Sequence, residues 1–368
     1  MTRSAVDLAP EYIRRIAPYV AGKPIDELAR ELGLDPATIV KLASNENPRG
    51  PGPAVVAAIA AATAELARYP DSNGFALKDA IAKRFAISPD EIVLGNGSND
   101  ILELVSLAFL RPGDEAIYSQ YAFVVYPLAT QARGAKGIEV PARDYAHDLA
   151  AMRAAITPRT RLVFIANPNN PTGTWIAPDA IEAFIASVPK DVVVVLDEAY
   201  NEYLDPADDA NATRWVSRFA NLVVSRTFSK AYGLAALRVG YGVMDTSLAD
   251  IVNRVRPPFN VNSFAQAAAI AALADGAYVD ASRALNRAGM RTLAAGFDAL
   301  HLHHVPSHGN FIMLDVGDGM AVFDKLLRAG VIVRPLANYG LPQWLRITVG
   351  LEHENARLLA ALPRALGR

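Results

Sequence analysis

The sequence predicts an α/β protein with a large, mostly parallel β-sheet domain and a smaller α+β domain. Between residues 53 and 240, segments of helical periodicity alternate with short apolar runs that are typical of strands buried on both faces. After residue 255, two long helical segments come first, and short strands follow before a last helix. The length of 368 residues also favours two or more domains.

The N-terminal segment from Leu8 to Leu34 is expected to form an arm with two short helical pieces. A loop rich in proline, glycine and asparagine follows at residues 41–51. Helices and strands then alternate, which predicts a parallel sheet covered on both faces. Helices are predicted at Val55–Leu66, Leu77–Phe85, Asp100–Phe109 and Pro178–Ile185, and strands at Ile92–Leu94, Glu115–Ser119, Gly137–Val140, Leu162–Ile165 and Val192–Leu196.

The C-terminal part has a different pattern, with longer helices and shorter strands. Helices are predicted at Asn260–Ala274, Tyr278–Leu300 and Glu354–Leu362, and strands at Phe311–Asp315, Val331–Pro335 and Trp344–Val349. We therefore expect residues 1–48 to form the arm and part of the smaller domain. Residues 49–255 would form the large domain, and residues 256–368 the rest of the smaller one.

The composition excludes several classes of function. The apolar fraction of 52% and the charged fraction of 20% are typical of a soluble globular enzyme. A net charge of −2 indicates no broad basic face, so neither nucleic acid nor a membrane surface is expected as a partner. Any bound anion must be held by a few placed cations.

Cysteine is absent, which excludes disulfides, thiolate metal sites and cysteine nucleophiles. The expected compartment is the cytoplasm, because the segment from Met1 to Arg15 carries charges throughout and contains no apolar core of a secretory signal. The alanine-rich stretches are too short or too polar to span a membrane. The histidines His301, His303 and His304 have no acidic ligands near them in the sequence, so no metal site is expected.

A single lysine, Lys230, stands in a polar stretch just after the apolar run Leu222–Val224. This run predicts a buried strand, so Lys230 should lie near a strand end, where open α/β sheets bind their ligands. Two interpretations are possible. Lys230 is either a solvated loop lysine, as most lysines are, or a desolvated amine that forms a Schiff base.

Two further polar residues follow predicted strands and should meet Lys230 at the same sheet edge. Asp197 is the first charged residue after the strand at Val192–Leu196. It would serve either as a helix N-cap or as the partner of a protonated heteroaromatic nitrogen. Asn170 lies in a loop of asparagines and prolines after the strand at Leu162–Ile165, and such loops usually form only turns.

Cationic and glycine-rich positions indicate anion binding. The segment Gly95–Asp100 follows a strand and opens a helix, which suits a phosphate, although its spacing is not that of a dinucleotide or P-loop motif. Thr227 and Arg238 complete a credible seat for one phosphate. Arg334 and Arg346 lie in apolar strands, where each needs an internal carboxylate or an anionic substrate.

Taken together, these motifs resemble the fold-type I pyridoxal-phosphate aminotransferases over nearly the whole chain, and among them the histidinol-phosphate aminotransferase group. The resemblance implies the aspartate aminotransferase-like fold and pyridoxal 5′-phosphate as cofactor. The motifs that carry it are Asn45-Glu-Asn-Pro, Arg68-Tyr-Pro-Asp71, Asn167-Pro-Asn-Asn-Pro-Thr-Gly173, Asp197-Glu-Ala-Tyr200, Thr227-Phe-Ser-Lys230 with Gly233-Leu, and Leu237-Arg-Val-Gly240.

The resemblance also implies roles for single residues. Lys230 would bind the cofactor covalently and then move the proton between the substrate and the cofactor, while Asp197 would keep the pyridine nitrogen protonated. The other implied cofactor ligands are Tyr200 and Asn170 at the phenolate oxygen, Phe123 on the ring face, and Ser98, Asn99, Thr227 and Arg238 at the phosphate. The chain departs from the family pattern at Asn99, where many relatives carry an acid.

Substrate and partner contacts follow from the same resemblance. Tyr69 matches a tyrosine that reaches the phosphate of the neighbouring subunit, which implies a homodimer with shared active sites. Arg346 matches the arginine that binds the anionic end of the substrate. The residues implied near it are Tyr19, Asn45 and Arg334.

The expected activity is a ping-pong transfer of an amino group between glutamate or 2-oxoglutarate and histidinol phosphate or imidazole-acetol phosphate. An aromatic (phenylalanine or tyrosine) aminotransferase is the alternative within transferases, because Tyr339 and Trp344 lie between the two arginines. A decarboxylase or lyase acting on a phosphorylated amino acid would use the same Lys230 and Asp197, since the fold does not decide which bond of the α-carbon breaks.

Overall fold

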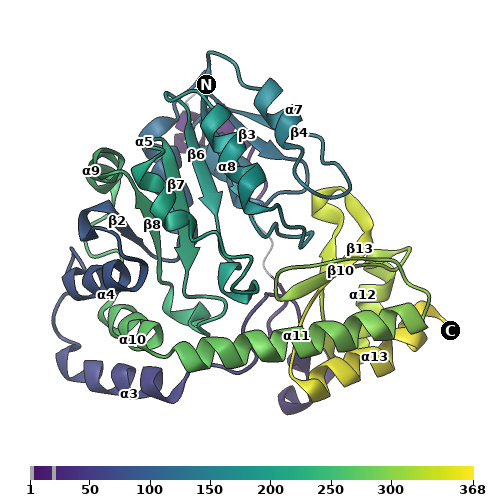
Figure 1. The fold of residues 1–368 in the computed structure, drawn as a ribbon. Helices are drawn as coiled ribbons and strands as arrows, with labels where there is room; N and C mark the ends of the chain where they lie inside the picture. The colour runs from purple at the N-terminus through teal and green to yellow at the C-terminus, as the bar shows by residue number, and fades with distance from the viewer. Residues whose placement is uncertain (1–3, 19–21) are drawn as a thin grey trace.

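The computed structural model describes residues 4–18 and 22–368, and its larger part is built on a seven-stranded sheet (Figure 1). The strands are β2 (Ile92–Gly95), β3 (Glu115–Ser119), β4 (Lys136–Val140), β5 (Thr160–Ala166), β6 (Val193–Asp197), β7 (Leu222–Thr227) and β8 (Gly240–Met244). Their order in the sheet is β2-β8-β7-β6-β5-β3-β4. Strands β7, β6, β5, β3 and β4 run parallel to one another, whereas β8 is antiparallel to its neighbours β2 and β7. The sheet is therefore mostly parallel, as predicted.

Helices cover both faces of this sheet. In β6, Val194 and Leu196 pack into one apolar cluster and Val193 and Val195 into another, so the strand is buried on both sides. The first cluster includes residues of α3 (Pro53–Ala62), α4 (Phe75–Phe85), α7 (Leu149–Ala154), α8 (Pro178–Ser187) and α10 (Ser263–Ala274). The second includes residues of α5 (Ser98–Phe109), α6 (Val125–Ala132) and α9 (Thr246–Val255).

The smaller part contains a four-stranded antiparallel sheet, whose order is β12-β13-β10-β9. Its strands are β9 (His304–Val305), β10 (Phe311–Asp315), β12 (Arg334–Leu336) and β13 (Leu341–Thr348). Its core is shared with α11 (Gly276–Ala299), α12 (Gly319–Arg328) and α13 (Glu352–Leu366). Figure 1 shows the long helix α11 running from the side of the large sheet to the small sheet.

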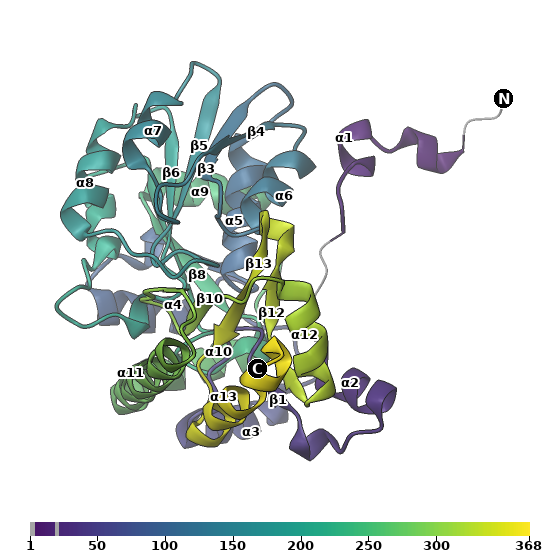
Figure 2. The same cartoon turned by 90° about the vertical axis from the view of Figure 1, so that its right-hand side faces the viewer.

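The N-terminal segment contains the two short helices expected, α1 (Glu11–Arg14) and α2 (Ile25–Leu32). Figure 2 shows α1 projecting from one side of the molecule. Strand β1 (Val40–Lys41) then pairs in parallel with β11 (Val331–Ile332) beside the small sheet. The segment thus joins the smaller part before the chain enters the large one.

The structure corrects parts of the predicted element list. The strand predicted at Val331–Pro335 is divided into β11 and β12, because the two halves pair with different strands, β1 and β13. Strand β8 and helices α6, α7, α9 and α12 were not predicted. Helix α10, assigned from the sequence to the smaller domain, packs its alanines into the core of the large sheet. We therefore propose a domain boundary inside α11 rather than at residue 255.

Candidate active site

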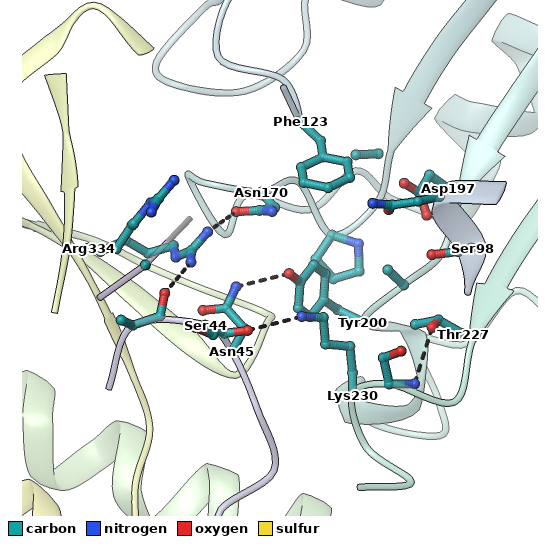
Figure 3. Close-up of a pocket in the computed structure, with 18 of the residues that line it drawn as sticks. Ser44, Asn45, Ser98, Phe123, Asn170, Asp197, Tyr200, Thr227, Lys230 and Arg334 are labelled. Carbon is teal, nitrogen blue, oxygen red and sulfur yellow. Dashed lines mark hydrogen bonds between the residues drawn. The ribbon is translucent and has the colours of Figure 1, made fainter. Parts of the chain in front are cut away.

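A pocket lies where the carboxyl ends of the parallel strands face the small sheet (Figure 3). Asp197 ends β6 and Thr227 ends β7, while Ser98 is the first residue of α5 after β2. The N-terminal segment around Asn45 and strand β13 close the other side. Predicted residues that line the pocket are Asn45, Ser98, Asn99, Phe123, Asn170, Asp197, Tyr200, Thr227, Lys230, Arg238, Arg334 and Arg346.

Lys230 is a pocket residue and not a solvated loop lysine. Its Nζ donates a hydrogen bond to the carbonyl oxygen of Ser44 at 3.2 Å. The same atom lies 5.7 Å from the ring centroid of Tyr200. Burial, with a smaller effect of the neighbouring arginines, lowers the pKa of Lys230 to about 8. About a tenth of the amine is therefore neutral and nucleophilic at pH 7, and about half at pH 8.

Asp197 is buried and only partly satisfied. Its Oδ2 accepts a hydrogen bond of 2.8 Å from the hydroxyl of Tyr126. Its Oδ1 is buried without a hydrogen-bond partner among the described residues. Burial raises the pKa of Asp197 to about 6, against the effect of the Tyr126 hydrogen bond. A buried carboxyl oxygen without a partner indicates a site for a cationic donor supplied by a ligand.

Tyr200 is held by contacts on two sides of its ring. Asn45 Nδ2 donates to the Tyr200 hydroxyl oxygen at 2.9 Å, and Asn45 Oδ1 accepts from the Thr348 hydroxyl at 3.0 Å. The Tyr200 ring packs edge-on against Phe311 at 5.1 Å. Burial raises the pKa of Tyr200 to about 12. Asn45, expected at the substrate, therefore also orients Tyr200 and links the N-terminal segment to β13.

One end of the pocket forms an anion seat. The first turn of α5 begins at Ser98 and directs its N–H groups into the space beside Arg238. Arg238 Nη1 donates to the Ser229 hydroxyl at 3.1 Å and to the carbonyl of Ala235 at 3.0 Å. A Cβ at Gly97 would lie 2.4 Å from Arg238 Nη2, and Gly97 has a φ of +86°. Only glycine leaves room for this approach.

The opposite end of the pocket carries two arginines. Arg346 Nη1 donates to Asn170 Oδ1 at 2.6 Å, and Nη2 donates to the carbonyl oxygen of Ala43 at 2.7 Å. Figure 3 shows Arg334 on the far side of Lys230 from the anion seat. The pocket therefore offers positive charge at both ends, with an amine between them.

Of the two aromatic residues between the arginines, only Tyr339 lines the pocket. Trp344 is turned into a buried cluster, where its ring lies edge-on to Tyr145 at 5.2 Å and to His303 at 5.5 Å. Trp344 therefore does not line the pocket itself, and of the two only Tyr339 would contact an aromatic substrate directly. Trp344 stands two residues before Arg346 and so shares its face of β13, but it lies further along the strand, beside Tyr339.

The residues of the site that were not identified from the sequence include Tyr126 and Ser229. Tyr126 stands three residues after Phe123; its ring meets Phe123 edge-on at 5.9 Å, and its hydroxyl donates to Asp197. Ser229 lies between Thr227 and Lys230, and its N–H donates to Thr227 Oγ1 at 3.1 Å. Ser229 could have been identified from its position inside the motif Thr227-Phe-Ser-Lys230. Nothing in the sequence around Tyr126 indicates its contact with Asp197.

Two predicted residues do not enter this pocket as described. Tyr69 is 83% exposed, stacks on Phe259 with a centroid distance of 4.8 Å, and is not part of the pocket lining of its own chain. Tyr19 lies outside the described residues.

Within residues 4–18 and 22–368, no group of three or more His, Cys, Asp or Glu side chains is placed to hold a metal ion. No helix of those residues combines the length and apolarity needed to cross a membrane.

A family model described as aminotransferase class I and II matches residues 37–362 of the chain. The chain belongs to this aminotransferase family. The matched region begins before β1 and ends in α13, so it contains every strand of both sheets and every residue of the pocket lining from Ala43 to Arg346.

Curated relatives resemble this aminotransferase over their full lengths. Histidinol-phosphate aminotransferase 1 of Cupriavidus pinatubonensis is 59% identical over 365 residues, which is 98% of this chain and 97% of the relative. Histidinol-phosphate aminotransferase of Methylobacillus flagellatus is 57% identical, covering 100% of this chain and 99% of the relative.

Solved structures agree with this relationship. The crystal structure of histidinol-phosphate aminotransferase from Sinorhizobium meliloti, in complex with pyridoxal-5′-phosphate, matches this chain with a TM-score of 0.91 and 29% identity over 99% of both chains. A Thermus thermophilus aspartate aminotransferase variant matches with a TM-score of 0.85 and 25% identity, over 97% of this chain and 99% of that one. The predicted aspartate aminotransferase-like fold is confirmed.

Proposed function

We propose that the protein is a pyridoxal-phosphate-dependent aminotransferase that acts on histidinol phosphate and 2-oxoglutarate, and forms imidazole-acetol phosphate and glutamate. The observation that carries the proposal is the two-ended pocket, in which Lys230 lies between an anion seat at Arg238 and a second cationic end at Arg334 and Arg346. A cofactor phosphate suits the first end, and an anionic substrate suits the second. The names of the relatives reported above support histidinol phosphate as a substrate.

The residues present fit pyridoxal phosphate. The unpartnered Oδ1 of Asp197 suits a protonated pyridine nitrogen, and the first turn of α5 beside Arg238 suits a phosphate. Further residues proposed to hold the cofactor are Ser98, Asn99 and Thr227 at its phosphate, Tyr200 and Asn170 at its phenolate oxygen, and Phe123 on its ring face. When bound, the cofactor supplies a ring that accepts the electron pair released when the substrate's Cα–H bond breaks.

Lys230 is proposed to attach the cofactor and to act as general base and acid. Its desolvation leaves about a tenth of the Nζ neutral at pH 7 and about half at pH 8, so the neutral amine can take the proton from the substrate's α-carbon and return it at the acceptor carbon. Asp197, which is 4% exposed, is proposed to stay opposite the ring nitrogen and not to move the substrate's proton. The Tyr126 hydrogen bond helps to keep it charged opposite a cationic nitrogen.

The second end of the pocket sets the choice of substrate. Arg334 and Arg346 suit a phosphate monoester as well as the carboxylates of glutamate, which explains how one site serves both half-reactions of a ping-pong cycle. An aromatic aminotransferase is the second candidate, because the Tyr339 side chain lines this end. A decarboxylase or lyase remains a candidate of another class, since Lys230 and Asp197 serve either chemistry.

Single-turnover experiments distinguish these candidates. The protein loaded with pyridoxal phosphate is mixed in turn with histidinol phosphate, phenylalanine, tyrosine and glutamate, and conversion of the bound cofactor to its amine form is followed by absorbance. We expect stoichiometric conversion, fastest with histidinol phosphate. Faster conversion with phenylalanine or tyrosine would favour the aromatic enzyme. Release of carbon dioxide without conversion would contradict an aminotransferase.

We further propose that the protein is a homodimer that works in the cytoplasm. Tyr69 and Phe259 form an exposed aromatic pair, with 83% and 43% of their surfaces accessible. Such a pair on the surface favours an interface with a second copy, through which Tyr69 would reach the partner's cofactor phosphate. The cysteine-free composition fits a reducing compartment.

A further inference from the structure

A buried ion cluster lies directly behind the pocket, on the other face of the large sheet. Its centre is Arg226 of β7, which is only 2% exposed. Arg226 Nε donates to Glu198 Oε2 at 2.9 Å, and Nη2 lies 2.7 Å from the same oxygen. Glu198 is itself 4% exposed. The two charges therefore meet almost entirely out of water.

More groups complete the surroundings of the guanidinium. Glu202 Oε1 lies 3.9 Å from Arg226 Nη1, and Asp209 Oδ1 lies 3.7 Å from Nη2. The guanidinium carbon lies 5.0 Å from the ring centroid of Phe85. Tyr241 is the register partner of Arg226 on β8. We call Arg226, Glu198 and Glu202 the Arg226 cluster.

The members of the Arg226 cluster are close neighbours in sequence of three pocket residues. Glu198 directly follows Asp197, Glu202 stands two residues after Tyr200, and Arg226 directly precedes Thr227. Neighbouring side chains of a strand point to opposite faces of the sheet, so Thr227 faces the pocket while Arg226 faces the core behind it.

The backbone strengthens this connection. Asp197 is the register partner of Ser225, and the N–H of Glu198 donates to the carbonyl of Ser225 at 2.9 Å. The ladder between β6 and β7 thus continues one residue past Asp197. The ion pair between Glu198 and Arg226 then joins the two segments at the carboxyl ends of β6 and β7. The 3-10 helix η5 (Asn201–Tyr203) brings Glu202 back to the same guanidinium.

Stability alone does not explain the cluster. Removing two charges from water is costly, and buried ion pairs are often no more stabilising than apolar residues of the same volume. Glu202 also keeps one oxygen, Oε2, buried without a hydrogen bond among the described residues. Hydrogen-bonded charges fix the relative positions and orientations of their side chains, whereas apolar side chains of the same volume do not.

We propose that the Arg226 cluster is a positioning device that fixes the ends of β6 and β7 and the turn through η5, so that Asp197, Tyr200 and Thr227 are held at the cofactor. None of its members touches the pocket, so they act only through these neighbours. This proposal rests on pyridoxal phosphate as the cofactor and does not depend on which amino donor the enzyme uses.

Three variants test the proposal on the full chain. Arg226→Met removes the charge, Arg226→Lys keeps the charge but loses the two-point contact with Glu198, and Arg226→Met with Glu198→Leu replaces the pair by apolar side chains. The control, Arg218→Met, breaks the Arg218–Glu182 ion pair of 2.6 Å at the exposed edge of the same protein. Each apoprotein is titrated with pyridoxal phosphate, and thermal unfolding and the circular dichroism of the bound cofactor are recorded.

We expect the apolar double variant to fold, to bind pyridoxal phosphate about 10- to 100-fold more weakly, and to show altered cofactor dichroism, as changes behind a ligand-binding shell do. Arg226→Lys should recover part of the affinity, and Arg218→Met should match the wild type. A double variant with wild-type affinity and dichroism would overturn the proposal, whatever its melting temperature. If even Arg226→Lys fails to fold, the cluster serves folding and the proposal is equally wrong. Failure of the wild type to bind the cofactor would instead contradict the proposed function.

Discussion

Arg334 and Arg346 lie directly opposite each other on the antiparallel strands β12 and β13. Like charges in this position repel, which destabilises a sheet unless an anion lies between or beside them. Arg346 is 7% exposed and is held by Asn170 and the carbonyl of Ala43. The arrangement keeps two guanidinium groups at one end of the pocket, where both would stabilise the dianionic substrate group proposed above.

The first prediction concerns Arg334. Replacing it by glutamine should raise the KM for histidinol phosphate about 10- to 100-fold, because a lost charged hydrogen bond costs about 1.5–3 kcal/mol. The affinity for pyridoxal phosphate, bound at the other end, should not change. Steady-state kinetics and cofactor titration measure both quantities. Arg291→Gln on the exposed face of α11 is the matched control, and an unchanged KM would remove Arg334 from the substrate site.

The sequence predicts the strand-end residues of the site well, because their signal is local. Asp197, Thr227 and Lys230 each follow an apolar run, and parallel strands bring such ends to one edge. The anion seat is also local, since Gly97 and Ser98 belong to one strand-to-helix turn. For these residues, one segment of sequence contains both the fold signal and the chemistry.

Contacts between distant segments were not predictable in this way. The hydrogen bond between Tyr126 and Asp197 joins residues 71 positions apart in the sequence, and the one between Asn45 and Tyr200 joins residues 155 positions apart. The division of Val331–Pro335 depends on β1 taking the first half as a partner. Strand β8 escaped prediction because its glycines weaken the apolar pattern, yet those glycines are needed where Gly240 passes Ser98.

The second prediction tests the support of Asp197. Tyr126→Phe removes the 2.8 Å hydrogen bond and leaves Asp197 without its hydroxyl partner. Because that bond lowers the pKa of Asp197, its loss should raise the pKa further above the ordinary range and weaken the pairing with a cationic nitrogen. We expect cofactor affinity to fall about tenfold. Tyr118→Phe, outside the pocket, should bind the cofactor normally, and equal affinities for both variants would contradict the assignment.

The third prediction follows from the lowered pKa of Lys230. The neutral amine is the nucleophile, so the rate at which the apoprotein takes up pyridoxal phosphate covalently should rise with pH around a midpoint of about 8. For a lysine with an ordinary pKa, the midpoint of this rate profile would be about 10.4. Stopped-flow absorbance measures the rate. Lys230→Ala should lose covalent attachment and turnover together, and borohydride reduction of the wild type should label Lys230 alone. Full turnover by Lys230→Ala would overturn the mechanism.

The fourth prediction concerns His147, which is buried and whose Nε2 lies 3.0 Å from the carbonyl oxygen and 3.2 Å from the N–H nitrogen of Ala166 at the end of β5. Burial lowers the pKa of His147 to about 4 in the folded protein, whereas it is about 6.5 when unfolded. Between these values the unfolded chain binds more protons, so the contribution of His147 is complete above about pH 6.5 and is lost as the pH falls towards about 4.

Urea unfolding of the wild type and of His147→Gln measures this effect. The glutamine amide can donate to the carbonyl or accept from the N–H of Ala166, but it does not titrate. The wild type should lose more unfolding free energy than the variant between about pH 7 and about pH 4.5, by an amount on the order of 2–3 kcal/mol. Taking the difference between the two proteins removes the contribution of carboxyl groups such as Asp197. Parallel pH profiles would show that His147 is charged in the folded state.

The last prediction distinguishes a shared active site from a self-contained one. Tyr69→Ala and Lys230→Ala should each inactivate the enzyme, Tyr69→Ala mainly through weaker binding of the cofactor phosphate. In a mixed dimer, the Tyr69→Ala subunit keeps its own Lys230 and receives an intact Tyr69 from the Lys230→Ala subunit, so one complete site is restored. Refolding the two variants together should therefore regain activity that neither shows alone.

Tyr69 is 83% exposed in the single chain, which allows it to leave Phe259 and contact a partner. If Tyr69 served its own subunit, the mixture would stay inactive. A Tyr69→Phe variant separates the hydroxyl from the ring, since it should preserve the dimer, measured by sedimentation, while losing affinity for the cofactor.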